Sequence, residues 1–190
     1  MTNQKTIKII ELSSFNPRKG KEHPSIKSEY YYVASWAGLF ARRLKKLYTE
    51  LGIEVWRAEP EFNHVSEKVI FGGLLGVIFP YKKPIIPKTL TYKMINRLKQ
   101  YEKKYKLIIH YNSLYNVFFN HIVPKILTDT RIILSHHGGI PPKKKGIKNR
   151  LKRYLLEKSY HKFAYITYLR KEIKEWLQTI NYYQGLSFLP

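Results

Sequence analysis

Two adjacent histidines followed by two glycines, in Ser135-His136-His137-Gly138-Gly139, are the residues of this sequence best suited to chemistry. An imidazole can bind a metal, transfer a proton or donate a hydrogen bond, and glycine lets a ligand approach the backbone closely. The segment lies between the apolar run RIIL (131–134) and a basic run at 143–153. Three interpretations are open: a metal site, a ligand-contacting turn, or a solvated loop that ends a strand.

The metal site is the least favoured interpretation. Metal ligands must converge on one point, whereas neighbouring side chains at the end of a strand point to opposite sides. The sequence shows no H-x-x-x-H or H-E-x-x-H pattern, and no carboxylate is close to the two histidines. Cysteine is absent, which excludes a disulfide framework and a cysteine-based zinc site. We therefore expect no metal, and we favour a turn in which an imidazole donates a hydrogen bond to a sugar or phosphate oxygen.

The charge of the chain is strongly positive, with 35 Lys and Arg against 13 Asp and Glu, a net charge of +22. Such a chain attracts nucleic acid, anionic membrane surfaces or phosphorylated ligands. The first residues lack the layout of a signal peptide. The longest apolar run, at 69–79, is much shorter than the roughly 20 residues of a membrane-spanning helix. We expect a cytoplasmic protein that could lie peripherally at the inner face of a membrane.

Short apolar strands alternate with amphipathic helices along the 190 residues. This alternation predicts one α/β domain over 1–190, a Rossmann-like parallel sheet with helices on both faces. Residues 60–90 contain four prolines and little periodicity, so we expect an irregular insertion or loop there. The expected strands are 7–12, 53–56, 107–111, 131–134 and 164–169, the expected helices are 33–51, 91–104, 114–124, 147–160 and 170–179, and the chain ends in an apolar stretch at 186–189.

The ends of the predicted strands are the places to look for a ligand. In parallel sheets of this kind, ligands bind at the carboxyl ends of strands, in the loops that follow. The loops that begin at Ser13, Asn112 and Ser135 are therefore candidates. His110 also stands at the end of its strand, where it either faces the ligand or packs in the core.

The order of these features resembles the N-terminal domain of GT-B fold glycosyltransferases, most closely the retaining family 4 type. The resemblance rests on RIILSHHGG, a basic helix, FAYITYL with the helix after it, and the terminal GLSFLP, which is similar to the passage into the family's second domain. KKYKLIIHYNS is also similar to a stretch in which the family's strand ends near a histidine. The element order matches through nearly the whole chain, and His-Gly and FLP are the most specific motifs.

The resemblance implies the N-terminal, acceptor-side half of an enzyme that transfers a sugar from a nucleotide-sugar donor to an acceptor, often a lipid-linked one. His137 matches the family's histidine before glycine, near the donor sugar, and is the implied catalytic residue. The family's first loop carries paired glycines beside the donor phosphates, whereas this chain offers Gly20 among basic side chains that could substitute in part. The implied substrate and donor contacts are Asn16, Arg18, Lys19, Gly20, Asn112, His136, Gly138 and Gly139.

The family's second domain has no counterpart within these 190 residues. In the family, that domain binds the nucleotide and carries a pair of glutamates. The resemblance therefore implies that this chain transfers sugar only together with such a C-terminal GT-B domain, in the same or a separate chain. It implies no cofactor, because the nucleotide-sugar is the substrate.

The basic run KKKGIKNRLKR (143–153) contains seven cations in eleven residues. It can be a solvated helix face opposite a core face made of Ile147, Leu151, Tyr154 and Leu155. It can also contact an anionic membrane, or nucleic acid, which is less favoured because no recognised motif accompanies it. The alternative function is thus a non-enzymatic basic α/β module that binds nucleic acid or a membrane. The candidate contacts are Lys143, Lys144, Lys145, Lys148, Arg150, Lys152 and Arg153.

Overall fold

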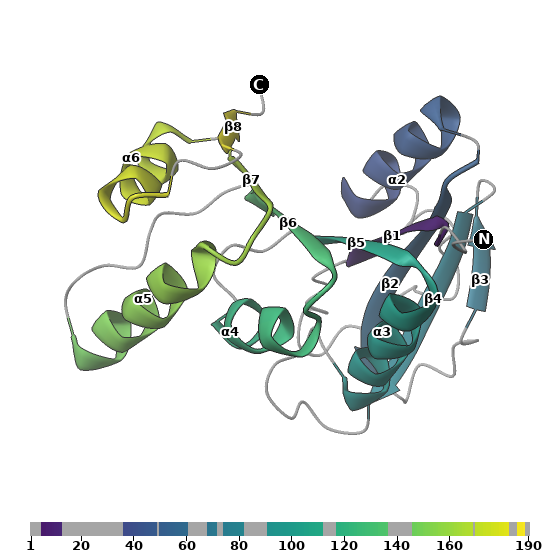
Figure 1. Ribbon diagram of the computed structural model, residues 1–190, viewed down its shortest axis with the longest axis horizontal. Coiled ribbons are helices and arrows are strands. Elements are labelled where there is room, and N and C mark those ends of the chain that lie inside the picture. The colour runs from purple at the N-terminus through teal and green to yellow at the C-terminus, as the bar shows by residue number, and fades with distance from the viewer. Residues whose placement is uncertain are drawn as a thin grey trace. The chain divides into compact units, whose positions relative to one another are not determined.

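The computed structural model describes much of the chain and divides it into two compact units, residues 1–109 and residues 110–190 (Figure 1). Each unit contains parallel strands joined through helices, so the expected Rossmann-like α/β fold is confirmed. The single domain expected over 1–190 stays a prediction. The residues described are 5–12, 36–48, 50–60, 68–71, 74–81, 91–111, 117–136, 146–168, 170–182 and 186–188.

The first unit is built on parallel strands with one antiparallel strand at its edge. β1 pairs in parallel with β2, β2 pairs in parallel with β4, and β3 pairs antiparallel with β4. The strand order is β3-β4-β2-β1-β5. The elements are β1 (Ile7–Leu12), α2 (Trp36–Leu47), β2 (Gly52–Pro60), β3 (Lys68–Phe71), β4 (Leu74–Tyr81), α3 (Tyr92–Lys104) and the first residues of β5 (Lys106–Tyr111).

Successive side chains of β2 point to two faces of this sheet, and each face is covered by a helix. Val55 is fully buried in a cluster with Ala41 of α2. The preceding residue, Glu54, points to the other face and meets Tyr101 of α3. Strands covered on both faces are apolar almost throughout instead of alternating. This explains why β1 and β2 were predictable as short apolar runs.

The expectation of an irregular segment at 60–90 is wrong for two stretches, which form β3 and β4. Phe71 pairs with Leu74, so only Gly72 and Gly73 separate the two strands. These strands were missed because β4 begins with the apolar run LLGVIF, which lacks the alternation of apolar and polar residues that indicates a strand. Residues 61–67 and 82–90 lie outside the described part of the chain.

The second unit repeats the alternation with shorter strands. β6 pairs in parallel with β7, and β7 pairs in parallel with β8, in the order β5-β6-β7-β8. Helix α4 packs against α5, and it continues through Pro124, where the expected helix ended, to Ile126. The elements after β5 are α4 (Val117–Ile126), β6 (Arg131–His136), α5 (Ile147–Tyr160), β7 (Tyr165–Tyr168), α6 (Lys171–Thr179) and β8 (Leu186–Phe188).

Aromatic side chains join a helix to a strand and two helices to each other in the second unit. Tyr111 of β5 packs against Phe119 of α4 with ring centroids 3.9 Å apart. Tyr160 of α5 meets the edge of Trp176 of α6 at 5.5 Å. Both pairs are buried, and aromatic pairs of this kind contribute about 0.5–1.5 kcal/mol beyond their buried area. Tyr182 follows α6 and is also buried.

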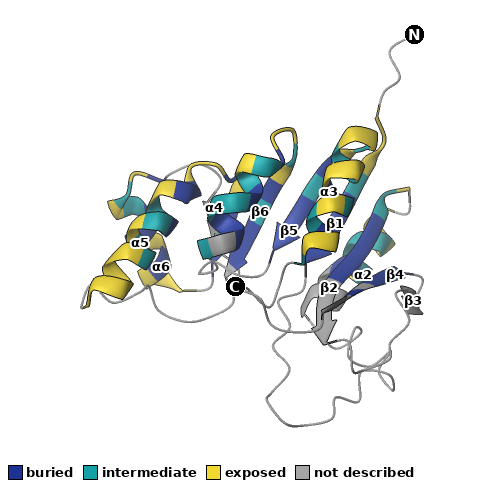
Figure 2. Ribbon diagram, turned by 90° about the horizontal axis from the view of Figure 1, so that it is seen from below, coloured by how far each residue is buried: buried dark blue, intermediate teal, exposed yellow. Residues whose placement is uncertain are grey.

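The buried face of α5 differs from the one expected. Ile147, Leu151 and Tyr154 were expected in the core, yet their exposed fractions are 85%, 57% and 55%. Instead Leu156 and Tyr160 are buried, and Figure 2 shows exposed residues along the outer side of this helix. The helix is therefore turned so that Tyr160 meets Trp176 of α6, and its apolar ridge has no cover from the described residues.

No described helix combines the length and the apolar character needed to cross a membrane.

Candidate functional site

A row of three polar side chains crosses neighbouring strands of the second unit near their carboxyl ends. His110 of β5 lies with its Nε2 2.5 Å from the Ser135 Oγ of β6. That hydroxyl is in turn 2.6 Å from the Thr167 Oγ1 of β7, and Ser135 and Thr167 are register partners. His110 and Ser135 are both buried. A hydroxyl between two polar partners satisfies them away from water, and such a chain fixes the three strand ends relative to one another.

This row lies directly before the double-histidine segment in the sequence. Ser135 is the residue before His136, which ends β6 opposite Tyr168 of β7. The hydrogen bonds of Ser135 thus fix the end of β6, the strand that precedes His137 in the sequence. Of the two roles open for His110, the structure gives it packing and hydrogen bonding in the interior.

Most of the site residues predicted from the sequence lie outside the described residues. These are the implied catalytic His137, the neighbouring Gly138 and Gly139, the first-loop residues Asn16, Arg18, Lys19 and Gly20, the loop residue Asn112, and the cations Lys143, Lys144 and Lys145. The structure does show the strands before their loops, since β1 ends at Leu12, β5 at Tyr111 and β6 at His136. Their roles stay predictions.

A buried carboxylate at the end of β1 was not singled out from the sequence. Glu11 has no exposed surface and stands one residue before the end of the strand, opposite Val55 of β2. A buried acid must be compensated by partners, and Glu11 makes interactions within the chain. The signal that could have identified it is a single acidic residue inside the apolar run IKIIEL.

The first unit contains a second polar cluster, centred on the buried Glu54. Its Oε1 is 2.7 Å from the Lys8 Nζ, and its Oε2 accepts a 2.7 Å hydrogen bond from the Trp56 indole. The Tyr101 hydroxyl donates to the same carboxylate at 3.2 Å. Glu54 stands only two residues after the start of β2, away from the strand ends where ligands bind. We therefore assign this cluster a structural role.

The cluster changes the acidity of Tyr101. Burial, followed by the negative charge of Glu54, raises the pKa of Tyr101 to about 12. The phenol thus stays protonated and remains a hydrogen-bond donor to Glu54 over the whole physiological range.

The described cations of the basic run lie on α5 and differ in their contacts and in their exposure. Arg153 places its Nε 2.6 Å from Glu157 Oε1 and its guanidinium over the ring of Trp176 at 5.3 Å. Trp176 also donates to the same Glu157 oxygen at 3.0 Å. Arg153 thus contacts side chains of its own unit. Arg153 and Lys152 are half-buried, whereas Lys148 and Arg150 are exposed.

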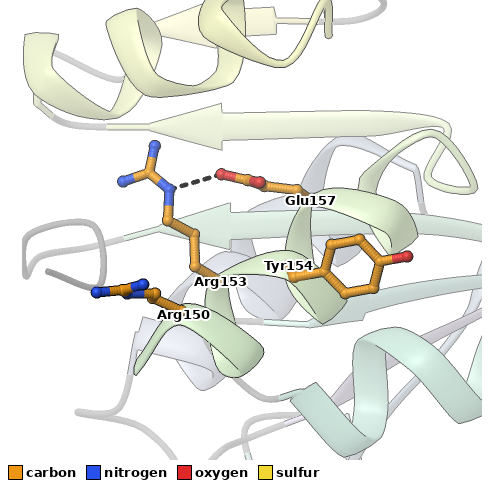
Figure 3. A pocket seen from close by; sticks show the side chains of 4 residues that line it. All are labelled: Arg150, Arg153, Tyr154 and Glu157. Atoms are coloured by element: carbon orange, nitrogen blue, oxygen red, sulfur yellow. Dashed lines mark hydrogen bonds and ion pairs between the residues drawn. The ribbon is translucent and has the colours of Figure 1, made fainter. Parts of the chain in front are cut away.

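Arg150, Arg153, Tyr154 and Glu157 line an open recess on α5 of about 380 Å³ (Figure 3). Two guanidinium groups and one carboxylate leave it with a positive charge. Among the described residues, no group of three or more His, Asp or Glu side chains is arranged to hold a metal ion.

Comparison with known proteins gives a structural likeness only. No protein-family profile matches the sequence, and no curated protein matches it. The sucrose-phosphate synthase of Thermosynechococcus elongatus is similar over 97% of this chain, with a TM-score of 0.61 and 11% sequence identity. The trehalose-6-phosphate synthase of E. coli, bound with UDP-2-fluoro glucose, aligns over 90% of this chain at 15% identity, with a TM-score of 0.46.

Both proteins are GT-B glycosyltransferases. This chain spans about half of the first, 48% of its length, and 42% of the second. At an identity this low, the structural likeness establishes the fold alone. This fold agrees with the GT-B architecture expected from the sequence. The family 4 type and the position of this chain in the N-terminal half of an enzyme stay predictions.

Proposed function

We propose that this chain is the acceptor-side half of a glycosyltransferase that uses a nucleotide-sugar donor. The observation that supports the proposal most is the likeness to sucrose-phosphate synthase through 97% of this chain and 48% of the other. A likeness of that extent fits one of the two halves of a GT-B enzyme. The resemblance of the sequence motifs to the N-terminal half points to the same part.

The transfer requires two domains, and this chain supplies one wall of the site. A C-terminal GT-B domain, in the same or a separate chain, binds the nucleotide of the donor. The bond between the anomeric carbon and the donor phosphate breaks, and the electron pair leaves with the nucleoside diphosphate. A new bond forms between the same carbon and an acceptor hydroxyl, whose proton is transferred to the departing phosphate. No cofactor takes part in this balance.

His137 is our candidate for the contact with the transferred sugar. It follows β6, whose last residues are fixed by the hydrogen bonds of Ser135. An imidazole there can donate a hydrogen bond to a sugar hydroxyl or a phosphate oxygen. His136, Gly138, Gly139 and Asn112 would complete this side of the site.

The loop after β1 is our candidate for the donor phosphates. Arg18 and Lys19 can pair with phosphate oxygens, and Arg does so with two parallel hydrogen bonds. Gly20 allows the backbone to approach, and Asn16 can donate from its amide. Arg18→Ala should therefore weaken binding of the donor, which is measurable as a raised KM for the nucleotide-sugar.

The proposal is tested by measuring release of nucleoside diphosphate from a panel of nucleotide-sugars. The chain is combined with its donor-binding domain, and His137→Ala is compared with the wild type. Removal of one such contact should lower kcat by roughly 100-fold or more. His161→Ala, an exposed histidine after α5, is the matched control and should keep wild-type turnover. Undiminished turnover in His137→Ala would remove the site assignment, and absence of turnover with every donor would contradict the proposed function.

A further inference from the structure

Three apolar side chains form an exposed ridge on α5, which we call the α5 ridge: Ile147, Leu151 and Tyr154. At 3.6 residues per turn, the three positions fall within about 60° of one another around the helix axis. All three are more than half exposed, although the opposite side of the same helix is buried through Leu156 and Tyr160. Contiguous exposed apolar surface of this kind marks a contact with another molecule or a membrane.

Positive charge borders the α5 ridge on both sides. Lys148 and Arg150 are exposed and lie roughly 70–90° to either side of the ridge. Lys158 continues the ridge by one turn, with its Nζ 5.6 Å from the Tyr154 ring. The recess beside Tyr154 adds the guanidinium groups of Arg150 and Arg153, with Glu157 as its one carboxylate (Figure 3).

This combination separates the three partners that the basic charge would otherwise permit. Nucleic acid would pair with the cations but would leave the apolar ridge exposed to water. A second copy of the chain would bring a further net charge of +22 against the same surface. An anionic bilayer satisfies both features, because its interface takes up apolar side chains while its phosphates pair with the flanking cations.

We propose that α5 is a membrane-docking helix, which lies in the plane of an anionic phospholipid surface with the α5 ridge inserted between the headgroups. Lys148 and Arg150 contact lipid phosphates on the two sides of the ridge. The recess of Arg150, Arg153 and Tyr154 receives a further headgroup phosphate. The proposal rests on the described surface of the second unit and does not depend on the transfer of sugar.

Binding to vesicles tests the electrostatic part. The wild-type chain should co-sediment with phosphatidylglycerol-containing vesicles and not with pure phosphatidylcholine. Lys148→Gln together with Arg150→Gln should lower the partition coefficient roughly 25-fold, about fivefold for each cation. The matched control, Lys99→Gln together with Lys103→Gln on the exposed side of α3, removes the same charge. Equal loss in both double variants would mean that binding follows net charge alone and would overturn the proposal.

Insertion of the ridge is tested with a fluorophore, since the chain has no cysteine and one can be introduced uniquely. An environment-sensitive probe attached through Leu151→Cys should shift its emission to the blue on phosphatidylglycerol vesicles. The same probe attached through Tyr92→Cys, at an exposed position of α3, should not shift.

Leu151→Ser should lower the partition coefficient roughly tenfold, whereas Tyr92→Ser should leave it unchanged. An unshifted emission of the Leu151→Cys probe on bound protein would overturn insertion. Release of the bound protein from vesicles by a mixed-sequence DNA duplex, at physiological salt and with retained probe emission on the duplex, would identify nucleic acid as the partner instead.

Discussion

The replacement Glu54→Ala should destabilise the protein far more than removal of an exposed carboxylate such as Glu175. Glu54 is buried, and its carboxylate meets Lys8, Trp56 and Tyr101. The alanine variant leaves the Lys8 ammonium, 17% exposed, without its counter-charge and the buried Trp56 indole without an acceptor.

The expected loss can be worked from these contacts. An unsatisfied buried donor costs about 1–3 kcal/mol, and removal of one partner of a buried ion pair costs roughly 3–5 kcal/mol. The two costs overlap, and the Lys8 side chain can move toward water. We therefore expect the free energy of unfolding to fall by roughly 3–5 kcal/mol in Glu54→Ala. Glu54→Gln keeps an acceptor for Trp56 and should lose about half as much.

The assay is urea unfolding followed by tryptophan fluorescence, with the free energy obtained by linear extrapolation. Glu175→Ala is the matched control, because Glu175 is 58% exposed and pairs with Lys171 at 3.7 Å. A surface pair of this kind contributes about 0–1 kcal/mol. If Glu54→Ala lost less than about 1 kcal/mol, no more than this control, the structural role of the Glu54 cluster would be refuted.

Other predictions concern the Glu54 cluster and the row of His110, Ser135 and Thr167. Because the pKa of Tyr101 is raised to about 12, the folded state keeps the phenol proton between pH 10 and about 12, whereas the unfolded state loses it near pH 10. The free energy of unfolding should therefore fall as the pH rises through this window. In Tyr101→Phe this free energy, measured by urea titration at each pH, should fall less steeply than in the wild type. Ser135→Ala leaves the polar groups of His110 and Thr167 without their shared hydroxyl and should lower the free energy of unfolding by roughly 1–3 kcal/mol. A loss below about 0.5 kcal/mol would show that water or another group replaces the hydroxyl.

Elements with a clear apolar pattern were predictable from the sequence within a few residues. β1, α3 and β5 illustrate this, since the two strands are short buried runs and α3 has a regular helical spacing that buries Met94 and Leu98. β3 and β4 were missed because KVIF is short, because LLGVIF shows no alternation of apolar and polar residues, and because the four prolines of 60–90 suggested a loop.

A local pattern of apolar residues does not show which distant side chain each residue contacts. The apolar positions Ile147, Leu151 and Tyr154 of α5 were expected to pack inward, but the inward face contains Tyr160, which packs against Trp176, 16 residues later in the sequence. Glu54 likewise meets Tyr101 across 47 residues of sequence. Pairings of this kind depend on the fold, so neither the α5 ridge nor the buried cluster could be read from local composition.

The most direct test of the proposed function is sugar transfer with and without this chain. The donor-binding domain is supplied with a radiolabelled nucleotide-sugar and a membrane extract as the source of acceptors, and labelled product is measured. We predict product only when both halves are present, together with an equal amount of released nucleoside diphosphate. Equal labelling by the donor-binding domain alone would contradict the assignment of this chain as the acceptor-side half of a glycosyltransferase.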